Sequence, residues 1–246
     1  MKQIISRGQK FAAEFLGTFL FSLFGTVVTQ PAVYNGLILS MMCYLFADVS
    51  GAHVNPAVST TFFILGHIDP IQMLLYVMAQ FAGAFAGVAL AKEMMPSDLS
   101  PCPVATLANA YVFGWETLCT FMFASTIMAV VWYKNHKPGY GGLGPLVIGA
   151  SLATNLHIAI PFTGGSLNPA RYLAVNTIFP CSYNITYIYI LGQITGAVIA
   201  SAMVAAIFGV SKDPWYCVCM DKAVVVTHTP PATTPIRSND NVRLDV

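Results

Sequence analysis

Six long apolar runs divide most of this sequence, and they constrain its fold more than any other feature. The runs cover residues 11–30, 34–50, 71–92, 108–132, 143–161 and 185–209. An α-helix needs about 20 mostly apolar residues to cross the hydrocarbon core of a bilayer. Only 9% of the 246 residues are charged, which is too few to cover the surface of a soluble domain of this length. We therefore expect an all-α membrane protein with six transmembrane helices.

The basic residues indicate how these helices are oriented. Lysine and arginine flank the first run and follow the fourth, at Lys2, Arg7, Lys10, Lys134 and Lys137. The loop over residues 93–106 carries acidic residues and no basic one. Because cytoplasmic loops are enriched in Lys and Arg, we expect both termini and the 134–142 loop in the cytoplasm, with the plasma membrane favoured over an intracellular one. Six crossings also place both ends on one side.

Composition divides the chain into three parts. Residues 1–10 form a short N-terminal segment, 11–210 form the membrane domain, and 211–246 form a polar tail. The tail lacks the apolar residues needed to form a core, so we expect it to be cytoplasmic and disordered. Cys217 and Cys219 lie in the tail close to the last run, where they are either free thiols or acceptors for lipidation.

Two further apolar segments are too short to cross a bilayer. They cover residues 56–66 and 169–179, and each would extend about 16 Å as a helix. Each follows directly after an Asn and begins with Pro. Asn suits the N-cap of a helix, and Pro suits the first helical position because its missing N–H costs no hydrogen bond there. A single copy is consistent with a capped turn, whereas two copies predict two re-entrant half-helices.

The two halves of the sequence repeat each other. The stretch AEFLGTFLF resembles the later stretch WETLCTFMF, with Glu14 and Glu116 in matching positions. Each half, 11–92 and 108–210, contains three long runs with a short segment between the second and the third. Since three crossings reverse the direction of the chain, the second half must be inverted in the membrane. Inverted repeats with broken helices that meet at the midplane are a transport architecture.

These motifs closely resemble those of the aquaporin, or major intrinsic protein, family over residues 10–210. The residues that carry the resemblance are Asn55, Pro56, Ala57, Asn168, Pro169, Ala170, Glu14 and Glu116. The resemblance implies an aquaporin-like fold of six transmembrane helices and two half-helices, and a homotetramer in the lipid bilayer with one pore in each subunit. It also implies passive flux of water or small neutral solutes, without enzymatic activity, metal or cofactor.

The chemistry of the two motifs favours neutral solutes over ions. Two half-helices that meet N-terminus to N-terminus place their positive dipole ends at the midplane. Asn55 and Asn168 can cap these helices through their carbonyl oxygens and direct their NH₂ groups into the pore. Arg171 is an intramembrane charge and therefore a functional candidate; it would either repel cations at the outer vestibule or bind loop carbonyls. Opposed dipoles and an Arg are the known basis of proton exclusion in aquaporin-type channels.

Counting without gaps from the two motif asparagines places the selectivity filter of the family at Asn35, Leu156, Gly165 and Arg171. Strict water channels of the family have an aromatic residue at the first of these positions and His at the second. The absence of both predicts a wider constriction that passes ammonia, hydrogen peroxide or urea together with water. A shift of one residue would instead place His157 in the filter.

Three more residues have roles that the resemblance implies. Glu14 and Glu116 are expected to accept hydrogen bonds from backbone N–H groups of the re-entrant loops, because a buried carboxylate needs such partners. A proton relay is the alternative role for them. His53, two residues before the first motif Asn, either lines the pore or packs within its loop.

Three alternative functions stay open: a glycerol-type facilitator, a poorly conducting structural member of the family, and a secondary transporter. The glycerol branch has an Asp where this chain has Tyr172. A secondary transporter would need an ion site or titratable relay at mid-membrane, for which the sequence offers only Asp48 besides the two glutamates. The net charge of +1 argues against a nucleic-acid partner, and the six cysteines lack metal-ligand spacing.

Two features belong to the predicted outer side. Cys102 and Cys181 both fall there, which allows a disulfide, although a sequence does not show whether two cysteines are close. Asn184 begins an Asn-Ile-Thr glycosylation motif directly before the last run.

Overall fold

Eight helices make up the fold of the residues that the structure describes. The computed structural model describes residues 5–96, 100–136, 142–179, 181, 184–209 and 214. Six helices are long and apolar enough to cross a membrane. They are α1 (Arg7–Val27), α2 (Pro31–Ser50), α4 (Pro70–Met94), α5 (Asn109–His136), α6 (Gly144–Thr163) and α8 (Thr186–Phe208). The other two are short, α3 (Pro56–Ile64) and α7 (Pro169–Ile178), and the described part of the chain contains no strand. The predicted fold class is confirmed.

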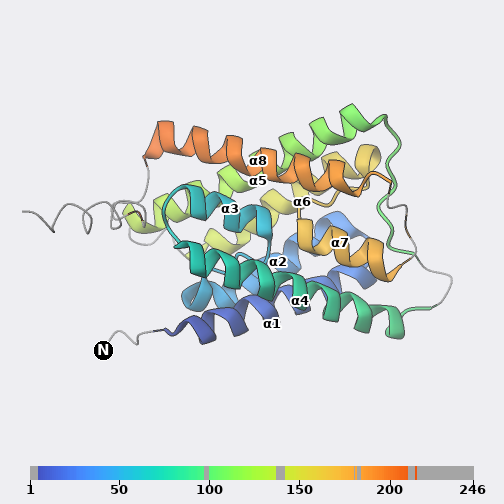
Figure 1. The fold of residues 1–246 in the computed structure, drawn as a ribbon, viewed down its shortest axis with the longest axis horizontal. Coiled ribbons are helices and arrows are strands. Elements are labelled where there is room, and N and C mark those ends of the chain that lie inside the picture. Colours follow the sequence, from blue (N-terminus) through green and yellow to red (C-terminus); the bar gives the residue numbers. More distant parts are fainter. Residues whose placement is uncertain are drawn as a thin grey trace, which may run out of the picture.

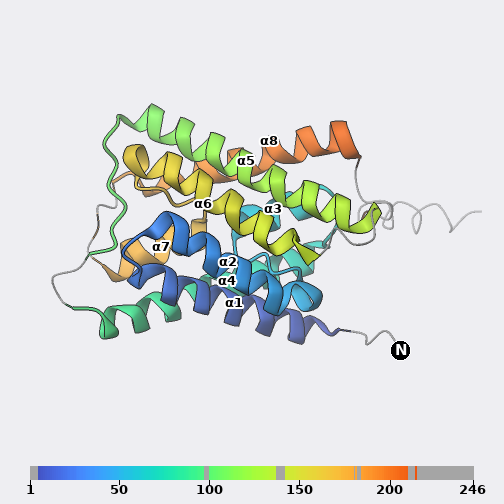
Figure 2. The ribbon, with the colours of Figure 1, turned by 180° about the vertical axis from the view of Figure 1, so that it is seen from behind.

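The six long helices run side by side as one bundle (Figures 1 and 2). α1 packs along α4 in the first half of the chain, and α5 packs along α8 in the second half, while α2 and α6 pack together between the halves. The start of α1 and the end of α8 lie at the same end of the bundle (Figure 1), as an even number of crossings requires.

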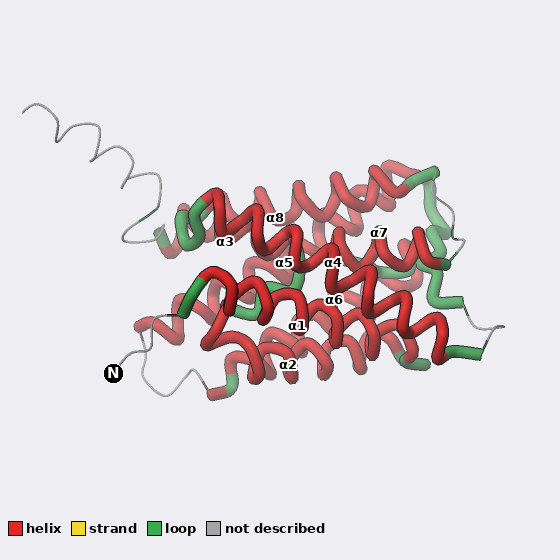
Figure 3. The backbone as a smooth tube through the Cα atoms, turned by 60° about the horizontal axis from the view of Figure 1, so that its bottom comes forward, coloured by secondary structure: helices red, strands yellow, loops and turns green. Residues whose placement is uncertain are grey.

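The two short helices lie within the bundle, one in each half of its length (Figure 3). α3 packs against α8, and α7 packs against α4. Each half-helix therefore rests on the last long helix of the opposite repeat. This exchange is what brings the two Asn-Pro-Ala motifs together.

Capping decides where the first helix begins. α1 starts at Arg7 rather than at residue 11, because Ser6 forms a capping box with Gln9. The Ser6 hydroxyl accepts from the Gln9 N–H at 3.2 Å, and the Gln9 side chain accepts from the Ser6 N–H at 2.8 Å. Residues 7–10, expected in the N-terminal segment, are thus helical. The tail predicted for 211–246, with Cys217 and Cys219, lies outside the described residues apart from Pro214.

Glycines allow the long helices to approach closely. A Cβ atom on Gly87 of α4 would lie 2.3 Å from the carbonyl oxygen of Phe19 on α1. One on Gly196 of α8 would lie 2.5 Å from the carbonyl oxygen of Thr117 on α5. Small residues at helix contacts are the usual means of close packing in a bilayer, where lipid is as apolar as the side chains. These contacts bring α4 close to α1 and α8 close to α5.

Replacing Gly87 by Ala should therefore destabilise the folded protein. The added methyl group has no space against the backbone of α1, and overpacking of this kind costs about 1–3 kcal/mol. We expect a lower midpoint of thermal unfolding in detergent, measured by size-exclusion chromatography with fluorescence detection. The matched control is Gly114→Ala on α5, where a Cβ meets no atom within 4 Å. An equal fall in both variants would contradict the packing argument.

Candidate functional site

The two Asn-Pro-Ala motifs meet at the centre of the bundle, each at the start of a half-helix. Asn55 caps α3, because its Oδ1 accepts from the N–H of Ala57 at 2.9 Å. Asn168 caps α7 in the same way and accepts from the N–H of Ala170 at 3.1 Å. In both motifs the proline is the first helical residue. Both half-helices therefore begin as the sequence predicted.

The asparagine NH₂ groups also join the two motifs to each other. Nδ2 of Asn55 donates to the carbonyl of Leu167 at 2.8 Å, and Nδ2 of Asn168 donates to the carbonyl of Val54 at 2.9 Å. Each NH₂ group carries two hydrogens. One hydrogen of each asparagine NH₂ group thus holds the half-helices end to end.

The loops that lead into the half-helices have an unusual backbone conformation. Val54 and Leu167, each directly before a motif Asn, have φ angles of 43° and 56°. This left-handed region disfavours residues with a Cβ, above all β-branched ones such as Val. Each such residue costs about 1–3 kcal/mol and persists only when surrounding contacts impose it. The same two residues supply the carbonyls that bind the opposite asparagines.

A buried glutamate supplies those contacts to the first loop. Glu14 on α1 is fully buried and accepts from the backbone N–H groups of His53 at 2.9 Å and Val54 at 2.7 Å. It also accepts from the hydroxyl of Ser50 at 2.6 Å and the amide of Gln80 at 2.8 Å. All four partners are donors, so the buried carboxylate is compensated by hydrogen bonds.

The second loop repeats this arrangement. Glu116 on α5 is fully buried and accepts from the backbone N–H groups of Ser166 at 3.3 Å and Leu167 at 3.1 Å. The hydroxyl of Thr163 donates at 2.7 Å and the amide of Gln193 at 2.8 Å. Both glutamates therefore contact the re-entrant loops as the resemblance implied.

The supporting glutamines were missed at the level of sequence, although a signal for them exists. Gln80 and Gln193 each follow a Tyr by four positions, in the stretches YVMAQ and YILGQ. Both tyrosine hydroxyls donate to the backbone carbonyl of the last residue of the preceding long helix, Tyr76 to Ser50 of α2 and Tyr189 to Thr163 of α6. The repeated Tyr-x₃-Gln pattern therefore marks the helices that fix the loops.

A chain of cavities runs through the bundle past the two motifs. A wide cavity of about 490 Å³ at one end is lined in part by Arg171 and Leu156. These two residues also line a narrow cavity of about 10 Å³, together with Asn55 and Asn168. His53 lines the narrow cavity and a further cavity of about 400 Å³ at the opposite end. Shared lining residues thus connect both ends of the molecule.

The narrow cavity is the constriction of this path, because its volume holds about one water molecule. Most of its wall is apolar. The apolar side chains are Phe21, Leu39, Val54, Phe123, Leu152 and Leu156. Asn55 and Asn168 add polar groups to this apolar wall.

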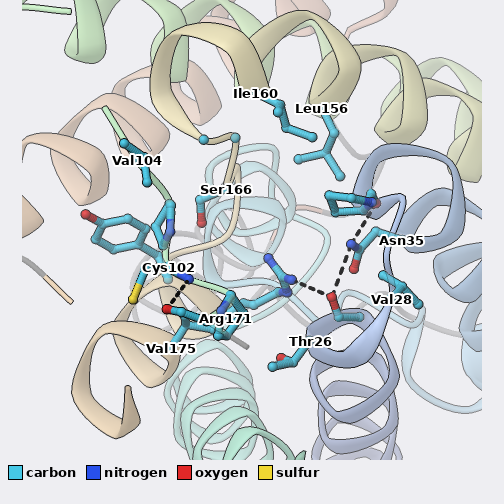
Figure 4. Close-up of a pocket in the computed structure, with 18 of the residues that line it drawn as sticks. Thr26, Val28, Asn35, Cys102, Val104, Leu156, Ile160, Ser166, Arg171 and Val175 are labelled. Atoms are coloured by element: carbon cyan, nitrogen blue, oxygen red, sulfur yellow. Dashed lines mark hydrogen bonds between the residues drawn. The ribbon is translucent and has the colours of Figure 1, made fainter. Parts of the chain in front are cut away.

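Arg171 reaches from α7 toward the end of α1 (Figure 4). Its Nη2 donates to the carbonyl of Gly25 at 2.8 Å. The Asn35 amide donates to the carbonyl of Pro31 at 2.7 Å and more weakly to that of Gly25 at 3.4 Å. A Cβ on Gly25 would lie 2.1 Å from Oδ1 of Asn35, so only glycine leaves room for this arrangement. The NH₂ group of Asn35 is thus bound to backbone carbonyls, while its Oδ1 has no hydrogen-bond partner among the described residues.

The other two counted filter positions also line the wide cavity. Leu156 points into it beside Ile160 (Figure 4). Gly165 has a φ of 62°, and a Cβ there would approach Leu156 to 3.2 Å. His157 is exposed on α6, and neither the wide nor the narrow cavity has it in its described lining. Of the two alternative registers, the structure brings Leu156 to the cavity and leaves His157 outside.

His53 both lines a cavity and packs within its loop, the two alternatives expected for it. It lines the narrow cavity and also packs within its loop, where its ring centroid lies 4.1 Å from that of Phe62. Its Nδ1 lies 3.0 Å from the Ser59 hydroxyl. The ring is therefore held in place at the far side of the constriction.

The remaining candidates lie at the two ends of the path. Cys102 and Cys181 form a disulfide with their Cα atoms 5.6 Å apart, and Cys102 lines the wide cavity. Asp48 lines cavities at the opposite end, away from the constriction. Asn184 is exposed and lies two residues before α8, and its glycosylation stays a prediction.

Known proteins resemble this chain in sequence and in fold. The family model described as major intrinsic protein matches residues 1–204. A relative named glycerol uptake facilitator protein-like 6, from Lactiplantibacillus plantarum, is 32% identical over 83% of this chain and 100% of its own length. Aquaporin-2 from Homo sapiens is 31% identical over 78% of this chain and 75% of its own. The X-ray structure of the aquaglyceroporin from Plasmodium falciparum has the same fold, with a TM-score of 0.69 and 20% identity over 88% of this chain and 100% of that one.

Replacing Glu116 by Gln should destabilise the second re-entrant loop. The glutamine amide has the size of the carboxylate, but its NH₂ group would face one of the four donors that now bind Glu116. A buried donor left without an acceptor costs about 1–3 kcal/mol. We expect a lower midpoint of thermal unfolding in detergent. Glu93→Gln, at an exposed position near the end of α4, is the control and should leave the midpoint unchanged. A wild-type midpoint for Glu116→Gln would show that the carboxylate is dispensable.

Proposed function

The chain belongs to the major intrinsic protein family, and we propose that it is a passive channel for water and small neutral solutes that excludes protons and ions. One observation carries the proposal: the path through the molecule is narrowest between the N-termini of two half-helices. The family is one of membrane channels and not of enzymes. Its six spanning helices make this chain an integral membrane protein.

Positive potential at the constriction supports the exclusion of cations. The N-termini of α3 and α7 each carry about half a positive charge, and Arg171 adds its guanidinium at the edge of the wide cavity. Among the described residues that line the narrow cavity, none is Asp or Glu. A water molecule satisfies the free N–H groups of Asn55 and Asn168 with its oxygen, whereas a cation meets no compensating negative charge.

In this proposal Glu14 and Glu116 support the loops and do not carry protons. Each carboxylate is occupied by two loop N–H groups, a hydroxyl and a glutamine amide. Neither glutamate is among the described residues that line the narrow cavity. A relay would need a titratable group with access to the permeating water.

The wall opposite Arg171 supports passage of solutes larger than water. Leu156 offers no hydrogen-bond donor, and the amide of Asn35 is engaged by backbone carbonyls. Gly165 adds no side chain. Pore width and the donors that line it decide which solutes pass, so ammonia, hydrogen peroxide and urea are the proposed solutes besides water. Glycerol is a second candidate, favoured by the relative named as a glycerol facilitator-like protein.

We also propose that four copies assemble in the bilayer, each with its own pore, and that both termini face the cytoplasm of a cell whose plasma membrane holds the channel. Large apolar side chains such as Met41, Leu45 and Leu74 are exposed on the outside of the bundle. They suit contact with lipid or with a neighbouring subunit. The start of α1 and the end of α8 lie at one end (Figure 1), which supports a common side for the termini.

Purified protein in liposomes should speed water efflux without carrying ionic current. Stopped-flow light scattering after an osmotic shock with an impermeant sugar measures water permeability, and voltage clamp of expressing oocytes measures current. We expect rapid shrinkage and background current, because the opposed half-helices favour neutral solutes. Currents that scale with water permeability would overturn the proposal, and so would shrinkage no faster than that of protein-free liposomes.

Replacing Leu156 by His should narrow the range of solutes. The imidazole adds a second donor opposite Arg171, so the permeability to urea should fall several-fold more than the permeability to water. Both are measured in the same liposomes. His157→Leu is the matched control on the same helix and should leave the ratio of urea to water permeability unchanged. The opposite pattern, with an effect only at His157, would mean that the filter register is shifted by one residue.

A further inference from the structure

One segment without regular secondary structure forms a side of the wide cavity. It joins the two halves of the chain between α4 and α5. The lining residues that it contributes are Ser100, Pro101, Cys102, Pro103, Val104 and Thr106. In Figure 4, Cys102 and Val104 lie on the side of the pocket opposite Asn35. We call residues 100–106 the mouth segment.

Two attachments hold the mouth segment in place. The Cys102–Cys181 disulfide links it to the chain directly after α7. At its other end the Thr106 N–H donates to the carbonyl of Phe162 at 3.1 Å, and the Thr106 hydroxyl donates to the carbonyl of Pro161 at 2.9 Å. Both carbonyls belong to the last turn of α6, where backbone oxygens lack helical partners.

Between these attachments, the mouth segment packs directly on the second re-entrant loop. A Cβ on Gly164 would lie 2.6 Å from Cα of Pro103 and 2.6 Å from the backbone nitrogen of Val104. Gly164 is followed by Gly165, which lines the wide cavity. The backbone of the mouth segment therefore contacts the residue directly before a counted filter position.

The mouth segment has little hydrogen bonding of its own. Within its described residues, the N–H of Cys102 lies 3.4 Å from the Ser100 hydroxyl, which is long for a hydrogen bond. Its position accordingly depends on the disulfide and on Thr106. We infer that the disulfide-linked mouth segment is a specificity determinant of the channel, since it holds Gly164 and Gly165 opposite Arg171 and so limits the cross-section open to a solute. This inference rests on the proposed channel function.

The test is the ratio of urea to water permeability in liposomes with and without the disulfide. The double variant Cys102→Ser with Cys181→Ser should keep its water permeability, while the ratio rises several-fold. Wild-type protein already in liposomes should show the same rise after treatment with tris(2-carboxyethyl)phosphine. This reagent converts the disulfide to two thiols while the phosphine is oxidised to its oxide with an oxygen atom from water. Reduction after reconstitution removes any doubt about folding of the double variant.

Two matched comparisons distinguish an effect of the mouth segment on the permeability ratio from a general effect of substitution. Cys43→Ser with Cys119→Ser removes the buried free thiols, keeps the disulfide, and should leave the ratio and its response to the phosphine unchanged. Thr106→Val weakens the second attachment and should raise the ratio. Thr154→Val removes a hydroxyl that bonds within its own helix, to the carbonyl of residue 150, and should not.

Amide hydrogen exchange gives a readout that does not depend on conduction. After reduction, the N–H groups of Thr106 and Gly165 should exchange faster than in the oxidised protein. An unchanged permeability ratio in a fully reduced channel that still conducts water would overturn the inference. If neither the oxidised nor the reduced protein conducts water faster than protein-free liposomes, the channel proposal fails. Unchanged exchange of the Thr106 and Gly165 amides would then also overturn the inference that the mouth segment holds Gly165 in place.

Discussion

The structure depends on how two helix N-termini with the same partial charge are kept face to face. α3 and α7 point their positive ends at each other, and these ends repel. The reciprocal bonds from Asn55 to the Leu167 carbonyl and from Asn168 to the Val54 carbonyl offset this repulsion. Each bond places a carbonyl oxygen next to the opposite helix terminus. The motif asparagines are therefore structural ties as well as donors at the constriction.

These hydrogen bonds require Val54 and Leu167 to adopt left-handed backbone conformations that their side chains disfavour. Each half of the inverted repeat stabilises its own loop with the same set of groups. A carboxylate, a hydroxyl and a glutamine amide surround each loop, centred on Glu14 in one half and Glu116 in the other. Close helix contacts at glycines hold the helices that carry these groups. The loops are thus fixed by long-range contacts and not by their own propensities.

The repeat becomes asymmetric where the proposed selectivity arises. The residue after the first Asn-Pro-Ala is Val58, which is buried in the core, and the residue after the second is Arg171. Arg171 therefore places a charge beside the wide cavity, and the first repeat has no charge at the matching position. Relatives named glycerol uptake facilitator protein-like 6 and Aquaporin-2 are 32% and 31% identical to this chain.

The sequence by itself determined the six spans, the two half-helices and their inverted order, because a bilayer leaves the backbone few alternatives to helices and because Asn and Pro cap helices locally. The resemblance of its motifs to the family also implied that the two glutamates bind the loops. Only the tertiary structure decided that Leu156 and not His157 faces the cavity, and that Cys102 lies beside Cys181. The tertiary structure also decided that each motif asparagine donates to a carbonyl before the opposite half-helix, and that Gln193 donates to Glu116. These features are contacts between residues far apart in the chain, and local pattern carries no information about which distant groups a fold brings within hydrogen-bonding or disulfide distance.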